Sequence, residues 1–363
     1  MQHQDRKLEF TGQHIYVGID VSKRSWSVSI LVGEYYHKKF TQPPQADVLL
    51  NYLRRNFPGA EYHCVYEAGY CGFWIYEALT QGGIQCLVVN PADVPTSHKE
   101  KIHKTDPVDA RKLAERLRSG ELHSIYIPER TALLDRSLVR MRALFVRKQT
   151  RCKNQIKALL AFYNVTPPLA LGPRAWSRRY IGWLEQISFS YASGDYALKA
   201  LLTELASLRT VIAGMTKQMR TLSQQERYRT HVKNLCCVSG IGLISAMTLL
   251  TEIIAIDRFH GNDSLAAFVG LIPGEHSSGD QKHDTGISPR RNRALRGILM
   301  EAAWVAVREE PALLHAFAEL SKHMPKSKAI VRIARKLLNR IHFVLKHQQP
   351  LSTTEAVPEM LAA

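Results

Sequence analysis

The sequence predicts a chain in three structural parts: an α/β domain with a mixed sheet, an α-helical coiled-coil region, and a mostly α-helical C-terminal domain. Up to about residue 128, short apolar runs alternate with helical patterns, as is typical of α/β domains. From about residue 129, long basic helical patterns follow, and one of them carries an unbroken heptad seam. A chain of 363 residues has room for about two to three domains with separate cores.

We expect the boundaries where the pattern changes. The expected segments are the α/β domain, the basic coiled-coil region, the C-terminal domain and a flexible tail, at residues 12–128, 129–230, 231–347 and 348–363.

Within the first segment, the order β-β-β-α-β-α-β indicates a mixed sheet that is covered on both faces. The β-branched and aromatic runs predict strands at residues 14–22, 25–31, 35–40, 62–67 and 84–90. Helical periodicity lies between them, at residues 46–57 and 72–80.

Two of these strands carry a carboxylate. Asp20 lies in the otherwise apolar first strand, where burial is costly unless something pairs with its charge. A satisfied core Asp that caps the next turn is the alternative explanation. Glu67 ends the fourth strand, which in a sheet of this order is commonly a neighbour of the first.

Two more carboxylates open a later helix, which begins at Thr105 or Asp106 and has Pro107 in its first turn. Asp106 and Asp109 are three residues apart and so share a face, although the helix dipole alone also favours acidic residues there. If this helix crosses the ends of the two strands, four carboxylates converge. Oxygen ligands at this density suit Mg²⁺ or Mn²⁺, and two such ions clamp a scissile phosphate.

The region after residue 129 contains two long predicted helices. The first is basic, and its candidate nucleic-acid ligands are Arg140, Arg147, Lys148 and Arg151. The second has apolar residues at alternating spacings of three and four, namely Leu198, Leu201, Leu205, Leu208, Ile212, Met215, Met219 and Leu222. An intramolecular helical hairpin and a homo-oligomeric coiled coil explain this seam about equally well.

The C-terminal segment contains several further candidates. Gly240 and Gly242 lie in a stretch that resembles a helix-hairpin-helix turn, whose backbone N–H groups approach a phosphate; a tight interhelical turn explains them as well. We expect a polar loop over residues 274–286. Arginines crowd the start of the next helix, which favours a nearby anion. These arginines and the cations of the last helix are candidate nucleic-acid ligands: Arg290, Arg291, Arg293, Arg296, Arg332, Arg335 and Lys336.

The charge balance indicates a polyanionic partner. Lys and Arg number 49 against 32 Asp and Glu, a formal net charge of +17, and nucleic acid is the usual partner of such an excess. No apolar run approaches the roughly 20 residues that a membrane span needs, and the N-terminus lacks a signal-peptide core. The six cysteines have no metal-ligand spacing. We expect a cytoplasmic protein with reduced thiols and no membrane partner.

Several short motifs resemble those of a known family. The segments at residues 17–23, 67–69 and 104–110 resemble the DEDD transposases of bacterial insertion sequences. The later segments at residues 239–242, 268–273 and 278–279 resemble the C-terminal transposase domain of the same family. This resemblance covers nearly the whole chain in the right order. It implies an N-terminal domain with the RuvC-like Holliday-junction resolvase fold of the RNase H class.

The resemblance also implies a mechanism. In this family a structured bridge RNA pairs with donor and target DNA, and a C-terminal serine is the nucleophile. By position that serine is Ser278, directly before Gly279, with Ser277 as the alternative alignment. The resemblance therefore implies an RNA-guided, nucleoid-associated recombinase that joins DNA through a covalent serine link. Asp20, Glu67 and the helical pair would hold Mg²⁺.

Two other functions fit the same residues. A structure-selective nuclease of the resolvase type would use two metal ions and water, with no covalent intermediate. A nucleic-acid-binding assembly protein would keep the carboxylates as structural remnants. Because strand exchange between two duplexes needs more than one active site, the first function predicts a homo-oligomer, either a dimer or a tetramer.

Overall fold

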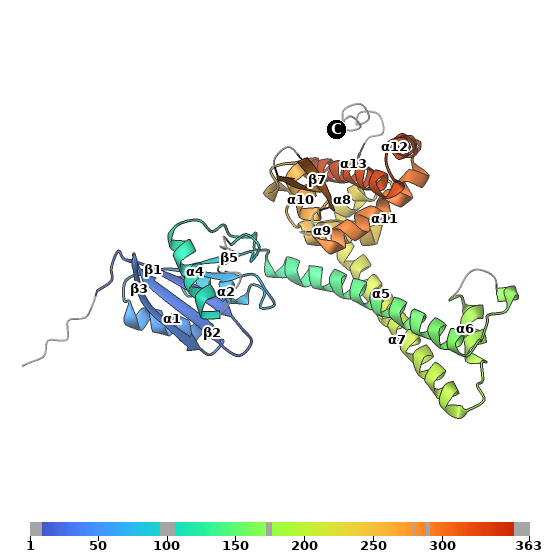
Figure 1. Ribbon diagram of the computed structural model, residues 1–363, viewed down its shortest axis with the longest axis horizontal. Helices are drawn as coiled ribbons and strands as arrows, with labels where there is room; N and C mark the ends of the chain where they lie inside the picture. Colours follow the sequence, from blue (N-terminus) through green and yellow to red (C-terminus); the bar gives the residue numbers. More distant parts are fainter. Residues whose placement is uncertain (1–8, 95–105, 172–175, 279–280, 288–290, 352–363) are drawn as a thin grey trace, which may run out of the picture. The chain divides into compact units, whose positions relative to one another are not determined.

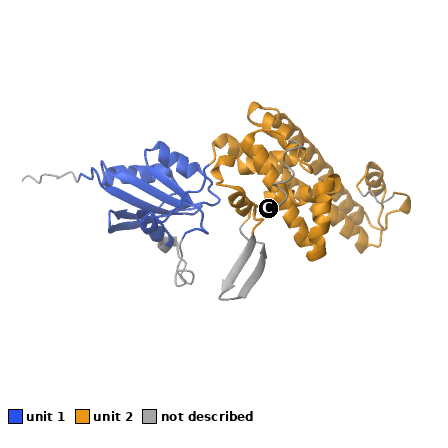
Figure 2. Ribbon diagram, turned by 90° about the horizontal axis from the view of Figure 1, so that it is seen from above, with its two compact units in different colours: residues 1–127 blue, residues 128–363 orange. Residues whose placement is uncertain are grey.

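The computed structural model describes residues 9–94, 106–171, 176–278, 281–287 and 291–351. The chain divides into two compact units, Met1–Ile127 (unit 1) and Pro128–Ala363 (unit 2), which Figure 2 shows in blue and orange. Some predictions fall outside the described residues: the cap at Thr105, the ligand Arg290, the tail from residue 352, and the side chains of Asp106 and Ser278.

Unit 1 contains the mixed sheet that the sequence predicts. Its five strands lie in the order β3-β2-β1-β4-β5. The strand β1 pairs antiparallel with β2 and parallel with β4, while β2–β3 is antiparallel and β4–β5 is parallel. The strand bounds are β1 His14–Val21, β2 Trp26–Val32, β3 Tyr35–Gln42, β4 Glu61–Glu67 and β5 Gln85–Val89.

Helices cover both faces of this sheet. Alternate residues of β1, namely Ile15, Val17 and Ile19, are fully buried in a core shared with α1 (Ala46–Asn56) and α2 (Trp74–Gln81). On the other face, Val65 of β4 packs in a second cluster with Leu113 of α4 (Asp106–Arg118). The side chains of each strand therefore alternate between the two faces.

The contact between α4 and β1 depends on Gly18. A Cβ atom at this position would overlap the carbonyl oxygen of Ala110 and lie 2.6 Å from the amide nitrogen of Ala114. Both neighbours are helix backbone atoms, which cannot move aside as a flexible side chain can. The glycine thus lets the helix lie directly on the strand.

We expect Gly18→Ala to destabilise unit 1 by about 3 kcal/mol or more, because the added methyl group overpacks a backbone contact. The measurement is thermal unfolding followed by circular dichroism. Gly214→Ala is the matched control, since a Cβ atom there meets nothing within 4 Å. In the middle of a helix, alanine is more favourable than glycine by about 0.5–1 kcal/mol. Wild-type melting of Gly18→Ala would contradict the close packing of α4 on β1.

Unit 2 begins with a helical hairpin. The long helices α5 (Arg130–Phe162) and α7 (Ala192–Ser223) lie side by side in Figure 1, with α6 (Arg178–Glu185) near their far ends. The heptad seam of α7 lies within this unit. Leu198, Leu205, Leu208, Met219 and Leu222 are buried, and the other seam residues are half-buried.

The hairpin decides between the two explanations of the seam. Leu198, Leu205 and Leu208 share a core cluster with Cys152 and Ile156 of α5. The seam is therefore used within one chain, and pairing between chains needs another surface.

The remaining helices form one further core. Their bounds are α8 Glu226–Leu235, α9 Leu243–Ile253, α10 Asn262–Val269, α11 Arg293–Glu309, α12 Pro311–His323 and α13 Lys326–His347. The apolar face of α13, which includes Ile333, Leu337 and Ile341, is fully buried in this core. Throughout the described ranges, the helices are too short or too polar to cross a membrane.

The expected polar loop at residues 274–286 is wrong. These residues form an antiparallel hairpin of β6 (Pro273–Ser278) and β7 (Gln281–Ile287). The segment has no apolar face, so the alternation that usually identifies a strand is missing from it. The one signal in the sequence is the Gly279-Asp280 pair, because glycine followed by aspartate is typical of two-residue hairpin connections.

Candidate active site and nucleic-acid interface

The carboxyl ends of β1 and β4 bring two carboxylates to one edge of the sheet. The strands are parallel, and the register pairs Gly18 with Val65 and Ile19 with Tyr66. One step further along both strands lie Asp20 and Glu67. Both side chains belong to the face that α4 covers, because residues two apart on a strand share a face. Both residues are half-buried.

The helix α4 adds the other two acidic positions. Asp109 is half-buried and directly precedes Ala110, whose carbonyl oxygen lies against Gly18. Asp106 is the first residue of the helix, three positions earlier. Close packing at Gly18 thus fixes the start of α4 on the same face of the sheet as Asp20 and Glu67.

Two neighbours of Asp20 were not predicted from the sequence. Burial raises the pKa of Tyr70, and the charges of Cys71 and Asp20 raise it further. The Lys23 ammonium lies 5.7 Å from the centroid of the Tyr70 ring. Lys23 follows the carboxyl end of β1, and Tyr70 follows that of the parallel strand β4. Because α/β proteins commonly bind ligands at such strand ends, this position in the sequence could have identified both residues as candidates.

The donor set of this edge suits a hard divalent cation. Asp20, Glu67, Asp106 and Asp109 all offer carboxylate oxygens, the ligands that Mg²⁺ and Mn²⁺ prefer. Among the described residues, one group of three potential ligands has its ligand atoms all within 4.8 Å of one another, and it lies at the opposite ends of β1 and β4. Asp20, Glu67 and Asp109 are together more widely spaced than that group.

The candidate nucleophile lies in unit 2. Ser278 is the last residue of β6 and pairs in register with Gln281, whereas Ser277 pairs with Lys282. Ser278 thus lies at the end of β6 that pairs with the start of β7. The strand β7 ends at Ile287, and α11 begins at Arg293.

The predicted nucleic-acid ligands differ in their exposure and in their interactions with other residues of the protein. Several are exposed on the helix surfaces, namely Arg147, Lys148, Arg151, Arg291, Arg293 and Arg332. Arg335 is paired with Asp263, and Lys336 is half-buried, with its pKa lowered by burial and by Arg340. Burial and Arg291 likewise lower the pKa of Arg296. The exposed set remains the predicted interface.

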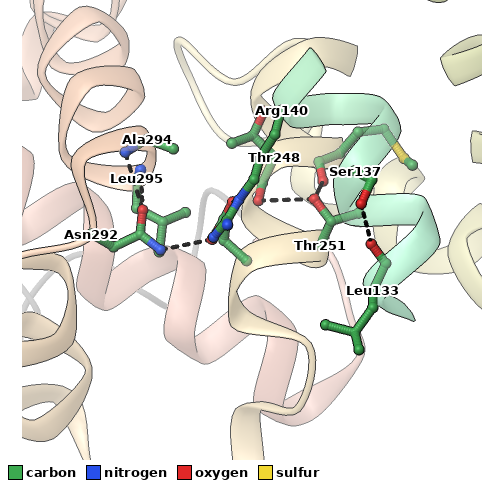
Figure 3. Close-up of polar contacts among 10 residues, drawn as sticks. Leu133, Ser137, Arg140, Thr248, Thr251, Asn292, Ala294 and Leu295 are labelled. Carbon is green, nitrogen blue, oxygen red and sulfur yellow. Dashed lines mark hydrogen bonds and ion pairs between the residues drawn. The ribbon is translucent and has the colours of Figure 1, made fainter. Parts of the chain in front are cut away.

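Arg140, a predicted nucleic-acid ligand, also forms an ion pair within unit 2. Its Nε and Nη2 atoms donate to the two carboxylate oxygens of Glu252 at 2.6 and 2.7 Å, and the Glu252 side chain is fully buried. Asn292 donates to the same carboxylate at 2.8 Å and accepts from the backbone N–H groups of Ala294 and Leu295. Figure 3 shows the side chains of Arg140, from α5, and Asn292, at the start of α11, pointing toward each other. The Glu252 carboxylate binds both of them.

This network ties α5, α9 and the N-terminus of α11 together. Asn292 is the N-cap of α11, so the buried carboxylate fixes the cap and, through it, the arginine-rich start of the helix. The ion pair of Arg140 is therefore structural, and its partner Glu252 is a buried anion that the sequence pattern does not indicate. The segment around Glu252 is apolar, and only the fold reveals its partners.

We expect Glu252→Gln to lower stability at neutral pH by about 1–2 kcal/mol, because charge-assisted hydrogen bonds from Arg140 and Asn292 become neutral ones while the half-exposed Arg140 stays solvated. Burial alone would raise the pKa of Glu252, but hydrogen bonds from Arg140 and Asn292 lower it below its usual 4.5. A lowered carboxyl pKa stabilises the fold above the unfolded-state pKa, and this stabilisation is lost as the pH falls through the folded-state value. The melting difference between variant and wild type should therefore shrink below about pH 4.

The matched control is Glu319→Gln, which removes an exposed i,i+3 pair with Lys322 and should change the melting temperature little. A Glu252→Gln protein that melts like wild type at pH 7 would contradict the structural role of the network.

Gly240 is also explained by packing. It has a φ of +81°, and a Cβ atom there would overlap the carbonyl oxygen of Ala302 and lie 3.2 Å from the amide nitrogen of Ala306, both in α11. The tight-turn alternative thus accounts for Gly240, and its predicted role as a phosphate ligand is not supported. Gly242 is exposed and is the N-cap of α9, so for this residue the phosphate prediction stands.

A mixed sheet with carboxylates on two neighbouring parallel strands and an overlying helix, joined to long basic helices, is typical of enzymes that cut nucleic acid with an RNase H-like domain. Comparison with known families agrees. Residues 17–165 match the model of the DEDD transposase domain of the IS110 type, and residues 232–319 match the transposase IS116/IS110/IS902 family. The chain belongs to this family of insertion-sequence transposases.

Individual relatives are similar over most of the chain. A putative transposase, y4qE, from Sinorhizobium fredii is 29% identical over 295 residues, which are 80% of this chain and 71% of that protein. The transposase for insertion sequence element IS1533 from Leptospira borgpetersenii is 25% identical over 348 residues, or 90% and 96% of the two chains. The protein is therefore an enzyme that cleaves and rejoins DNA.

Proposed function

We propose that this transposase moves an insertion sequence by serine chemistry under the guidance of a structured RNA. Asp20, Glu67, Asp106 and Asp109 would hold Mg²⁺ or Mn²⁺, and Ser278 would attack DNA. The observation that carries the proposal is the parallel register of β1 and β4, which brings Asp20 and Glu67 to one edge beneath α4. Serine attack and RNA guidance come from the family resemblance.

The chemistry exchanges one phosphodiester for another. The Ser278 oxygen bonds to phosphorus, the bond from phosphorus to the 3′ or 5′ oxygen breaks, and the serine proton passes in effect to the displaced oxygen. Bound Mg²⁺ would supply electrophilic stabilisation of the phosphate. Because the ester on Ser278 retains the bond energy, a hydroxyl of the second duplex can displace the serine and reseal the strand.

The carboxylates and Ser278 lie in different units, and Asp20 is more than 250 residues from Ser278 in the sequence. They would be brought together either within one chain or between chains of a dimer or tetramer. Since the α7 seam is buried within one chain, such an oligomer would form through other surfaces. Exposed cations of α5 and α11, such as Arg147, Arg151 and Arg293, would hold the RNA and the two DNA duplexes at the bacterial nucleoid.

A plasmid recombination assay tests this function. Purified protein is mixed in Mg²⁺ with a donor plasmid, a target plasmid and RNA transcribed from the non-coding DNA that flanks the reading frame. We expect joined products only with this RNA, and none with a shuffled RNA of equal length. Equal joining without RNA would contradict guidance. Nicked DNA that is never rejoined would favour the resolvase-type nuclease.

A further inference from the structure

We propose that His14, Glu61 and His63 form a second metal site, selective for Zn²⁺ or a similar transition-metal ion, at the amino ends of β1 and β4. Their ligand atoms all lie within 4.8 Å of one another. The register pairs His14 with Glu61 and Tyr16 with His63, so the three side chains project from adjacent strands on one face of the sheet.

The distances between the ligand atoms suit a small tetrahedral ion. The Nδ1 atom of His14 lies 3.2 Å from Oε2 of Glu61 and 3.0 Å from Nε2 of His63. Bond lengths of about 2.0–2.1 Å in a tetrahedral zinc site separate neighbouring ligand atoms by about 3.3–3.4 Å. Small movements of exposed side chains would therefore admit the ion, and no change of the strands is needed.

The surroundings of His63 hold its ring in place. The Tyr16 ring stacks on it with centroids 5.2 Å apart and an angle of 22° between the planes. Gln85 is its register partner on β5, so His63 has a neighbouring side chain on each adjacent strand. Neighbours in the outer shell restrict the orientation of metal-binding histidines.

The donor types separate this site from the carboxylate edge. Two imidazoles and one carboxylate favour Zn²⁺ over Mg²⁺, whereas an all-carboxylate set has the opposite preference. The six residue steps from His14 to Asp20 span about 20 Å along the strand, so one ion cannot serve both sites. The side chains of His14 and Glu61 are 49% and 57% exposed, which leaves a fourth position open to water. A metal ion bound here would cross-link the starts of β1 and β4.

Metal titration of the full chain tests the site. With Mg²⁺ in excess, Zn²⁺ or Co²⁺ should bind wild type and raise its melting temperature. His14→Asn, Glu61→Gln and His63→Asn should each weaken binding by more than about tenfold, since loss of even an outer-shell partner costs about 10–100-fold. The absorption of four-coordinate Co²⁺ should disappear in the same variants.

Two controls isolate the cluster. His123→Asn removes an exposed imidazole of the same unit, and Asp20→Asn alters the carboxylate edge; both should bind Zn²⁺ like wild type. The exposed thiols of Cys236 and Cys237 also attract zinc, but thiolate-bound Co²⁺ has a distinct charge-transfer absorption. The proposal would be overturned if Glu61→Gln and His14→Asn, as single variants, both bound Zn²⁺ with wild-type affinity. It would also be overturned if Asp20→Asn, but none of the three ligand variants, lost Zn²⁺ binding.

Discussion

Asp20→Asn is expected to abolish DNA cleavage in Mg²⁺ while leaving unit 1 folded. The amide keeps the shape of the side chain, so the half-buried position beside Glu67 and beneath α4 should still be filled. What is lost is the negative charge that a divalent ion needs. Metal stabilisation of the transition state contributes several kcal/mol, so cleavage should fall by at least about a thousandfold. The measurement is the rate at which labelled donor DNA is cut.

The same variant should behave differently without metal. Carboxylates that share a face repel each other, and removing one charge relieves that repulsion. In EDTA, Asp20→Asn should therefore melt above wild type, whereas the exposed Asp47→Asn in α1 should match wild type in both melting and cleavage. Normal cleavage by Asp20→Asn in Mg²⁺ would exclude the proposed metal site.

The sheet of unit 1 could be predicted because its strands are apolar and β-branched and its helices end at glycines or prolines. That pattern places Asp20 and Glu67 at strand ends. It does not give the register that sets them side by side, because register depends on hydrogen bonds between strands distant in the sequence. Nor does it give the role of Gly18, whose value lies in the absence of a Cβ beneath the helix α4.

The errors in unit 2 have a different cause. The heptad spacing of α7 correctly predicts an apolar stripe. The spacing does not show which helix covers that stripe, so only the fold distinguishes α5 from a second chain. The charge of Arg140 predicts an anionic partner but not the ion pair with Glu252, which lies 112 residues away in an apolar helix. The β6–β7 hairpin has only polar residues at its tip, so periodicity could not identify it.

Ser278→Ala is expected to bind DNA, RNA and metal like wild type, and to form no covalent protein–DNA adduct. The substitution removes a single oxygen from the last residue of β6 and adds no atom. Without the hydroxyl there is no atom to form the phosphoserine bond, so both cutting and rejoining stop. The measurement uses end-labelled donor DNA, quenched with denaturant and resolved on a denaturing gel, where wild type should retain label on the protein.

Ser277→Ala is the matched control, because it removes the same atom from the adjacent residue, which pairs with Lys282 instead of Gln281. It should form the adduct at a rate close to that of wild type. If Ser277→Ala is inactive and Ser278→Ala is active, the nucleophile is the neighbouring serine and the rest of the mechanism stands. If wild type cuts DNA but never retains label after denaturation, water is the nucleophile. The carboxylate edge of unit 1 would then be sufficient for a hydrolytic, resolvase-type reaction.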